Sequence, residues 1–522
     1  MPTQQTAGGQ SSERASNARW KLRLAALASG LLLAASRPSL DIGGLSLVGL
    51  VPLLIAVRGQ RVRTAASLGL IAGCAYYGVV VSWAWYFGAV ALFPFVLVLA
   101  VYWAAALAAI TWLRNQGWVS PIVVALTWIL FENALARWPL GGFSWGELGY
   151  AAHNIAPLRN LASLGGVSLV SGYIVAVNAL IANAVCGLRS RNPACKRAWQ
   201  MSLTAAGLAA LVVVWNVAAP STTPTGTLRV AALQGNNINR DLTPSEIGAL
   251  TLANNHFRLA DTVADPVDLI VFPESAMHPE SIDNPVIQSR LVRVARDHNS
   301  YVLANGIHEL PDGRVKNRNI VVMPDGRIAG TYDKRHLVPF GEYVPWRATL
   351  TKLIDALKRI PRDFVPGTNQ GRFELRGHVV SQVICFESAF GYAVRDDVRA
   401  GAELIVVSTN NRSYRRSANS AQHIAIAQLR AVETGREIIH ASVSGVSAHI
   451  DAKGEVVQHS QMFVNGILRS NVTTRRGSTI YVRLGDWPLL LAGCTVLALC
   501  IIEAIRARRR RGARASGSTS ST

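Results

Sequence analysis

Long apolar stretches constrain this chain more than any other feature of its sequence. Seven of them occupy roughly residues 20–37, 43–57, 64–84, 89–113, 118–136, 165–187 and 199–217, and an eighth occupies about 485–505. Most approach the ~20 residues that a helix needs to cross a bilayer, although the second is short and could be tilted or re-entrant. Charged residues make up only 16% of the chain. The pattern predicts a membrane protein with about eight spans.

The positions of these stretches divide the chain into five parts. Residues 1–18 are polar and small, which predicts a disordered segment. A bundle of seven spans is expected over 19–219, and a soluble domain of mixed composition over 227–480. The eighth span follows at 485–505, and a basic tail occupies 506–522.

Lys and Arg residues gather in alternate connections, which predicts the orientation of the spans. They lie at both chain ends and after the second, fourth and sixth stretches: Arg14, Arg19, Lys21, Arg23, Arg58, Arg61, Arg63, Arg114, Arg189, Arg191, Lys196, Arg197, Arg506, Arg508, Arg509, Arg510 and Arg511. With eight spans, all of these fall on one side, and the basic side is the cytoplasmic one. We therefore expect a bacterial cytoplasmic (inner) membrane protein with both termini inside and the soluble domain on the extracytoplasmic side.

The formal net charge of +21 raises the question of nucleic-acid binding. The densest basic run, Arg508 to Arg511, directly follows an apolar stretch. Such clusters are typical of segments that contact anionic lipid beside a span. We expect no nucleic-acid partner.

The connection over 137–164 holds Trp138, Phe143, Trp145 and Tyr150 among glycines. Two interpretations remain open. The aromatic residues could form a belt at the membrane interface, or the connection could line a lipid entrance beneath the soluble domain.

The soluble stretch has the pattern of an α/β domain. Short β-branched runs occur at 228–233, 269–272, 301–303, 320–323, 379–384 and 404–407, and helical patterns occur at 244–263, 286–297 and 419–437. Pro324-Asp325-Gly326 and Ala452-Lys453-Gly454 predict turns inside hairpins. The sequence has no phosphate-binding glycine loop and no His/Cys cluster with metal-ligand spacing, so we expect neither a metal nor another cofactor.

One cysteine out of six, Cys385, lies in the soluble stretch, so that domain has no disulfide framework. Cys385 follows an apolar run and is either a buried small residue or a nucleophile. Glu274 also follows an apolar run, and Lys334 lies in a polar segment after a hairpin strand. A thiol needs a base or a nearby cation to become a nucleophile. Glu274 could take the proton, and Lys334 could stabilise an oxyanion, but each could also be a helix cap or a solvated turn residue.

These segments resemble those of a known superfamily. Pro273-Glu274-Ser275, the Lys334 segment and Ile384-Cys385-Phe386-Glu387 are similar to the Glu–Lys–Cys triad of the nitrilase superfamily. The string at 334–345, Lys-Arg-His-Leu-Val-Pro-Phe-Gly-Glu-Tyr-Val-Pro, resembles the bacterial apolipoprotein N-acyltransferases within it. Residues 233–236 and 430–436 and the eight-span layout also fit, so the resemblance covers about 20–505. It implies a nitrilase-like αββα sandwich beside a multi-pass helical bundle.

The resemblance also implies an activity. Cys385 would attack an ester of a membrane phospholipid and hold the acyl chain as a thioester. The acyl chain would then pass to the α-amine of the N-terminal S-diacylglyceryl cysteine of an apolipoprotein. Glu274 would be the general base, and Lys334 would stabilise the oxyanion with a backbone N–H near residue 386. Glu342 and Glu387 would hold Lys334 and the site geometry.

The sequence departs from the family pattern over 408–416, where one aromatic residue, Tyr414, replaces an aromatic pair. Phe386 stands where tyrosine is common, and 237–242 lack the tryptophan found in many relatives. One alternative is a membrane-tethered nitrilase-type amidase or hydrolase. Another is a transporter or structural membrane protein with an inactive domain, which intramembrane charges such as that of Glu132 would favour.

Overall fold

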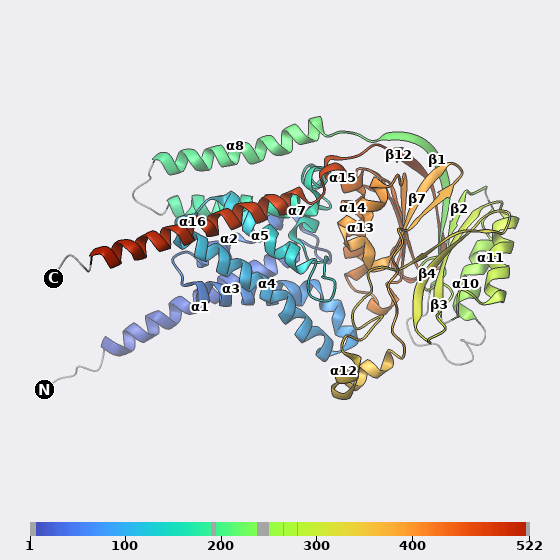
Figure 1. The fold of residues 1–522 in the computed structure, drawn as a ribbon, viewed down its shortest axis with the longest axis horizontal. Helices are drawn as coiled ribbons and strands as arrows, with labels where there is room; N and C mark the ends of the chain where they lie inside the picture. The colour runs from blue at the N-terminus through green and yellow to red at the C-terminus, as the bar shows by residue number, and fades with distance from the viewer. Residues whose placement is uncertain (1–6, 189–194, 237–249, 265, 279, 518–522) are drawn as a thin grey trace.

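A computed structural model describes residues 7–188, 195–236, 250–264, 266–278 and 280–517 of the chain. The molecule has two parts that lie end to end (Figure 1). A bundle of apolar helices forms one part, and a sandwich of two sheets flanked by helices forms the other.

Helices from both ends of the chain form the bundle. They are α1 (Ala7–Ala35), η1 (Gly43–Leu47), α2 (Val51–Ala56), α3 (Val62–Val80), η2 (Ser82–Phe87), α4 (Ala89–Asn115), α5 (Pro121–Leu135), η3 (Leu148–Ala152), α6 (Ala156–Arg159), α7 (Ala162–Leu188), α8 (Cys195–Ala218) and α16 (Trp487–Gly517). Within the described residues, four helical segments are long and apolar enough to cross a membrane: Ala89–Asn115, Ala162–Gly187, Gln200–Ala218 and Trp487–Arg511. Gly43–Ala56 and Pro121–Leu135 are shorter apolar helices. The prediction of several apolar helices is confirmed.

Small residues let two of these helices approach closely. A Cβ atom added at Gly69 of α3 would lie 2.7 Å from the carbonyl oxygen of Trp103 in α4. One added at Gly73 would lie 2.9 Å from the Cα atom of Ala100. Glycine at both positions therefore permits backbone contact of the kind that packs membrane helices without a hydrophobic driving force.

The helices run further than the apolar stretches predict. Helix α1 begins at Ala7, inside the segment 1–18 that the sequence predicts to be disordered, and residues 1–6 lie outside the described part. Helix α16 continues to Gly517, through most of the predicted basic tail. Extending an existing helix requires no new nucleus, so a polar flank can continue an apolar helix.

Two six-stranded sheets form the second part. The first has the order β12-β1-β2-β3-β4-β5, with β1 (Thr223–Gln234), β2 (Leu269–Val271), β3 (Tyr301–Glu309), β4 (Val315–Val322), β5 (Ile328–Asp333) and β12 (Gly466–Arg476). The second has the order β11-β10-β9-β8-β7-β6, with β6 (Arg372–Leu375), β7 (His378–Ile384), β8 (Leu404–Thr409), β9 (Ile438–Ser442), β10 (Ala448–Ile450) and β11 (Val456–His459). Strands β1, β2 and β3 pair in parallel, and so do β7, β8 and β9.

The apolar faces of the sheets form the core of the sandwich. Val230 and Val271 of the first sheet belong to the same buried cluster as Val380 and Val406 of the second. Helices α10 (Thr251–Asp261) and α11 (Pro285–Asp297) cover the outer face of the first sheet, and α13 (Gly391–Arg399) and α14 (Asn419–Thr434) cover that of the second (Figure 1). The remaining helical turns are α12 (Arg347–Leu353), η4 (Asp355–Arg359), η5 (Cys385–Ala389), η6 (Arg412–Tyr414) and α15 (Ile480–Leu484). The predicted αββα sandwich is confirmed, as are both predicted turns.

Helix α14 joins the sandwich to the bundle. Its Ile426, Leu429 and Val432 belong to the same apolar core as α3, α4 and α7. Helix α7 has non-helical backbone at Gly165 and Gly166, and there the carboxylate of Glu433 accepts a hydrogen bond from Val167 N at 2.7 Å. A side chain of α14 thus caps the longer half of α7.

The aromatic residues of the 137–164 connection do not share one environment. Trp138 is 70% exposed, whereas Trp145 is 4% and Tyr150 0% exposed. The interfacial-belt interpretation is therefore wrong for Trp145 and Tyr150, because both pack between the bundle and the sandwich.

Candidate active site

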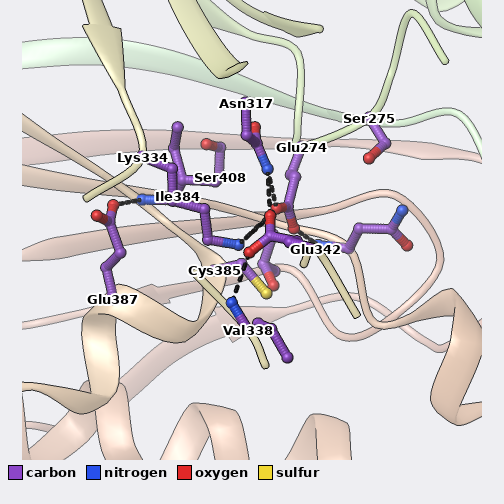
Figure 2. Close-up of polar contacts among 12 residues, drawn as sticks. Glu274, Ser275, Asn317, Lys334, Val338, Glu342, Ile384, Cys385, Glu387 and Ser408 are labelled. Atoms are coloured by element: carbon purple, nitrogen blue, oxygen red, sulfur yellow. Dashed lines mark hydrogen bonds and ion pairs between the residues drawn. The ribbon is translucent and has the colours of Figure 1, made fainter. Parts of the chain in front are cut away.

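The ends of three strands bring together the predicted site residues. Glu274 follows β2 and Lys334 follows β5 in the first sheet, and Cys385 follows β7 in the second. Figure 2 shows the sulfur of Cys385 on the side where Glu274, Lys334 and Glu342 converge. The sandwich therefore places a thiol beside an ammonium and two carboxylates, at the edge where the parallel strands end.

Lys334 lies between the two carboxylates. Its Nζ donates to Glu274 Oε1 at 3.2 Å and to Glu342 Oε1 at 2.9 Å, and its side chain is 2% exposed. Burial alone would lower the pKa of Lys334, but the two carboxylates more than offset it and raise that pKa well above its ordinary value. The lysine is a fixed positive charge at this site.

A chain of asparagine side chains orients Glu274. Asn317 Nδ2 donates to Glu274 Oε1 at 2.8 Å and to Glu342 Oε1 at 3.0 Å. Asn305 in turn donates to the Oδ1 atoms of Asn317 and Asn319, at 2.7 and 2.9 Å. The other carboxylate oxygen, Glu274 Oε2, accepts from Asn410 N at 2.8 Å. Both carboxylate oxygens of Glu274 therefore act as hydrogen-bond acceptors, which holds the side chain in one orientation.

The nucleophile candidate occupies a strained turn. Cys385 has a φ of +53°, a left-handed conformation that is uncommon for a residue with a side chain. Burial raises the pKa of its thiol to about 12, and the charge of Glu274 adds to that effect, whereas Lys334 opposes it. At neutral pH the resting group is therefore a thiol, and it needs a base at the moment of attack.

Glu387 holds the segments on either side of this site. It is 0% exposed, and it accepts hydrogen bonds from Tyr332 OH at 2.8 Å and from the backbone N–H groups of Arg335 (2.6 Å), His336 (3.2 Å) and Ile384 (2.8 Å). These donors lower its pKa despite burial, which raises it. Glu387 thus fixes the backbone next to Lys334 and next to Cys385. Glu342, in contrast, contacts the Lys334 ammonium directly and also accepts from Val338 N at 2.7 Å.

A second polar group lies against the Cys385 backbone. The carbonyl oxygen of Cys385 accepts a hydrogen bond from Ser388 Oγ at 2.9 Å and lies 3.2 Å from His423 Nε2. His423 Nε2 also lies 2.7 Å from Ser388 Oγ. Burial lowers the pKa of His423 well below its ordinary value, so the imidazole is neutral. With Ser388 donating to the carbonyl, the proton of His423 must be on Nε2.

The structure brings together all five predicted residues, Glu274, Lys334, Cys385, Glu342 and Glu387. Sequence reasoning missed Asn305, Asn317, Asn410 and His423. Asn317 and Asn319 are two residues apart on β4, an alternation of polar residues along one face of a buried strand that could have pointed to a role. Within the described residues, no group of three or more His, Cys, Asp or Glu side chains is placed to hold a metal ion.

A thiol, a carboxylate base and an ammonium on a sandwich of this kind define a nitrilase-type domain, here joined to a bundle of apolar helices. Comparison with family models agrees for both parts. Residues 229–480 match the carbon-nitrogen hydrolase family, and residues 29–180 match the apolipoprotein N-acyltransferase N-terminal domain.

Curated relatives match nearly the whole chain. An apolipoprotein N-acyltransferase of Geobacter metallireducens is 30% identical over 506 residues, covering 93% of this chain and 95% of the relative. Proteins of the same name from Gloeobacter violaceus (31% identical, 94% and 95% covered) and Azotobacter vinelandii (33%, 92% and 94%) are equally similar. The chain belongs to the apolipoprotein N-acyltransferase family.

Proposed function

We propose that this protein transfers an acyl chain from a membrane phospholipid to the α-amine of the N-terminal S-diacylglyceryl cysteine of apolipoproteins. Lipoprotein maturation is then its role, and Cys385 carries the acyl chain as a thioester between the two substrates. The observation that carries the proposal is the Cys385 thiol beside the Glu274–Lys334 ion pair, in a domain whose helix α14 shares the apolar core of the helical bundle.

In the first half-reaction, Glu274 takes the proton from the Cys385 thiol as the sulfur attacks the ester carbonyl carbon. The S–C bond forms, and the negative charge moves to the carbonyl oxygen. The tetrahedral intermediate then collapses with cleavage of the ester C–O bond. The proton on Glu274 passes to the departing alkoxide, so the lysophospholipid leaves with a free hydroxyl group and an acyl-thioester remains.

Lys334 stabilises the oxyanion of this intermediate. Its ammonium is buried, fixed by two carboxylates and close enough to Cys385 to lower the pKa of the thiol. A positive charge held in place before reaction loses no energy to reorganisation in the transition state. A backbone N–H near Phe386, in the turn that follows Cys385, supplies a second donor.

In the second half-reaction, the α-amine of the lipidated cysteine attacks the thioester. Glu274, again ionised, takes a proton from the amine as the N–C bond forms. Collapse of the intermediate breaks the S–C bond, and the proton returns to the sulfur. The products are an amide-linked acyl chain and a free Cys385 thiol, so the cycle needs no cofactor.

The cytoplasmic membrane is the proposed location, with eight spans, both termini inside and the sandwich on the extracytoplasmic side. Two features support this arrangement. Basic residues gather in alternate connections. The N-terminal end of α1 and the C-terminal end of α16 also lie at the end of the bundle that faces away from the sandwich (Figure 1).

A mass measurement tests the mechanism. Purified enzyme incubated with phospholipid should gain one acyl chain on Cys385, and Cys385→Ala should gain none while remaining folded and membrane-inserted. Addition of a diacylglyceryl-modified peptide should discharge the adduct into an N-acyl product. Robust transfer by Cys385→Ala contradicts the mechanism, and discharge to free fatty acid regardless of the peptide indicates the tethered hydrolase instead.

Reporter fusions test the topology. A reporter that is active only outside the cytoplasm should be active when fused near residue 350 and inactive when fused near 515. The opposite pattern contradicts the orientation.

A further inference from the structure

Aromatic side chains connect the surroundings of Cys385 with the helical bundle. Phe386, the residue after the nucleophile, lies 6.3 Å from the ring of Trp145 between ring centroids. Trp145 lies 6.2 Å from Trp83 of η2, and Trp83 lies 4.9 Å from Tyr414 in the loop after β8. We call Trp83, Trp145, Phe386 and Tyr414 the aromatic wall. Phe386 and Tyr414 are half-buried, and Trp83 and Trp145 are buried behind them, so the four rings form a continuous packed group between the bundle and the nucleophile.

One side chain of the sandwich holds both indole rings of this wall. Trp145 Nε1 and Trp83 Nε1 donate to the same atom, Gln422 Oε1, at 2.8 and 3.2 Å. An indole N–H is a donor only, and a buried donor without a partner is destabilising. Trp145 is 4% and Trp83 is 8% exposed, so Gln422 determines where both rings can lie.

The amide nitrogen of Gln422 also bonds to the helical bundle. Gln422 Nε2 donates to the carbonyl oxygens of Pro38 and Val80, at 3.0 and 2.9 Å. Val80 ends α3, where a carbonyl has no partner inside its own helix. All four hydrogen-bonding positions of the Gln422 amide are therefore used, and every partner belongs to the helical part of the molecule.

The next residue on α14 holds the nucleophile. His423 Nε2 lies 3.2 Å from the carbonyl oxygen of Cys385, and the His423 ring lies 5.1 Å from that of Trp145. Gln422 and His423 are both 0% exposed. Two consecutive residues thus set the position of the aromatic wall and of the Cys385 backbone relative to one another.

We propose that Gln422 is a positioning residue for the acyl donor: it holds Trp83 and Trp145, which pack behind Tyr414 and Phe386, so that an acyl chain lying against those two half-buried rings presents its ester carbonyl to Cys385. The inference rests on the proposed function, because it assigns the surface that directs the lipid substrate to this nucleophile. A displacement of about 1 Å at a reacting centre can cost on the order of 100-fold in rate. Trp145, one of the two rings that Gln422 holds, lies next to Phe386, the residue after Cys385. A displacement of Trp145 therefore changes the packing beside the reacting thiol.

The test is the single-turnover formation of the acyl-thioester on the full-length protein, followed by mass at several concentrations of phospholipid. Gln422→Leu should lower the maximal rate by about 10- to 100-fold, with a much smaller change in the phospholipid concentration for half-maximal rate. It should also narrow the difference in rate between donors with long and short acyl chains. Alkylation of Cys385 by iodoacetamide, a small soluble reagent, should proceed as in the wild type.

Gln428 provides a matched control on the same helix. It is also buried, and its amide also bridges elements, from the His153 ring to the carbonyl of Gly454, at 2.8 Å each. Gln428→Leu should leave the maximal rate and the chain-length profile near those of the wild type. Trp145→Phe keeps a ring in the wall but removes one donor to Gln422, and it should give a smaller loss of the same kind. This milder variant keeps the proposal testable if Gln422→Leu folds poorly.

Three outcomes would overturn the proposal. Equal losses of maximal rate in Gln422→Leu and Gln428→Leu would show that Gln422 only stabilises the contact between the bundle and the sandwich. If Gln422→Leu lost both alkylation by iodoacetamide and acylation, the substitution would have changed the reactivity of the Cys385 thiol itself. An unchanged rate in both Gln422→Leu and Trp145→Phe would show that the wall does not direct the donor. Failure of the proposed function is distinct, because the wild type would then form no adduct on Cys385.

Discussion

Lys334 with Glu274 and Arg430 with Glu433 are both buried ion pairs, but their surroundings differ. Both oxygens of Glu274 accept hydrogen bonds from the groups around Lys334, and the Cys385 thiol lies beside the pair. Arg430 and Glu433, 1% and 0% exposed, contact the bundle instead: Glu433 accepts from Val167 N, and Arg430 donates to Tyr150 OH at 2.9 Å. Within the described residues, Arg430 Nε is buried without a hydrogen-bond partner.

The difference teaches how a buried charge can be assigned a role. A chemically active pair is surrounded by groups that fix its protonation and point it at a reactive atom. A joining pair has its partners on a neighbouring structural element and can tolerate an unsatisfied atom. Burial and charge alone do not separate the two.

Of the variants that test the difference between the two ion pairs, Lys334→Met should cause the largest loss of acylation rate. The substitution removes the charge that faces the developing oxyanion, and loss of one such group costs about 100- to 1000-fold in rate. The measurement is the rate of acyl-adduct formation on Cys385, with Lys316→Met as a control because Lys316 pairs with Asp333 outside the site. Retention of more than about a tenth of the wild-type rate would contradict the assignment of Lys334 to the oxyanion.

Arg430→Met should affect stability rather than chemistry. Removal of one partner of a buried pair leaves the other charge uncompensated, which costs about 3–5 kcal/mol in the free energy of unfolding. Denaturant unfolding in mixed micelles measures it. The double variant Arg430→Met/Glu433→Gln should recover much of the loss, because it removes both charges and keeps an oxygen that can accept from Val167 N. If folded Arg430→Met fails to acylate Cys385, the Arg430–Glu433 pair also has a role in the chemistry, and the distinction between the two pairs is wrong.

The smallest expected change is in the alkylation rate of the resting Cys385 thiol, and it separates the charge of Glu274 from its role as a base. The raised pKa of Cys385 predicts that its alkylation by iodoacetamide rises about tenfold per pH unit from pH 8 to 10, since the thiolate fraction is still small there. Glu274→Gln removes a negative charge that raises this pKa, so alkylation at pH 9 should become about 3- to 10-fold faster. Acyl transfer should nevertheless be lost, because the base is gone. Slower alkylation in Glu274→Gln would show that Glu274 also activates the resting thiol.

Local features of the sequence predicted an α/β domain and three candidate site residues, Glu274, Lys334 and Cys385. Apolar runs ending in Glu274 and Cys385 indicate buried strands that deliver polar groups at one edge, and the structure has β2 and β7 there. The resemblance to a known family supplied the roles of Lys334, Glu342 and Glu387, which the residues alone left open.

The contacts of α14 could not be predicted in this way. Gln422 and Glu433 lie in a helix of ordinary composition, and their partners are Trp83, Trp145 and Val167, hundreds of residues earlier in the chain. Local propensity and periodicity carry no information on such pairings, because they depend on how two separately formed parts meet. Asn317 is an intermediate case: its alternation with Asn319 is visible in sequence, but its contact with Glu274 is not.

The cap that Glu433 places on α7 has a consequence for biogenesis. Val167 leaves the ribosome long before Glu433 is made, so the broken start of α7 enters the membrane without its carboxylate partner. A backbone N–H left without a partner in an apolar setting costs several kcal/mol. That segment therefore depends on water, lipid or a temporary neighbour until the sandwich has folded. The bundle is complete only once α14 has docked against it.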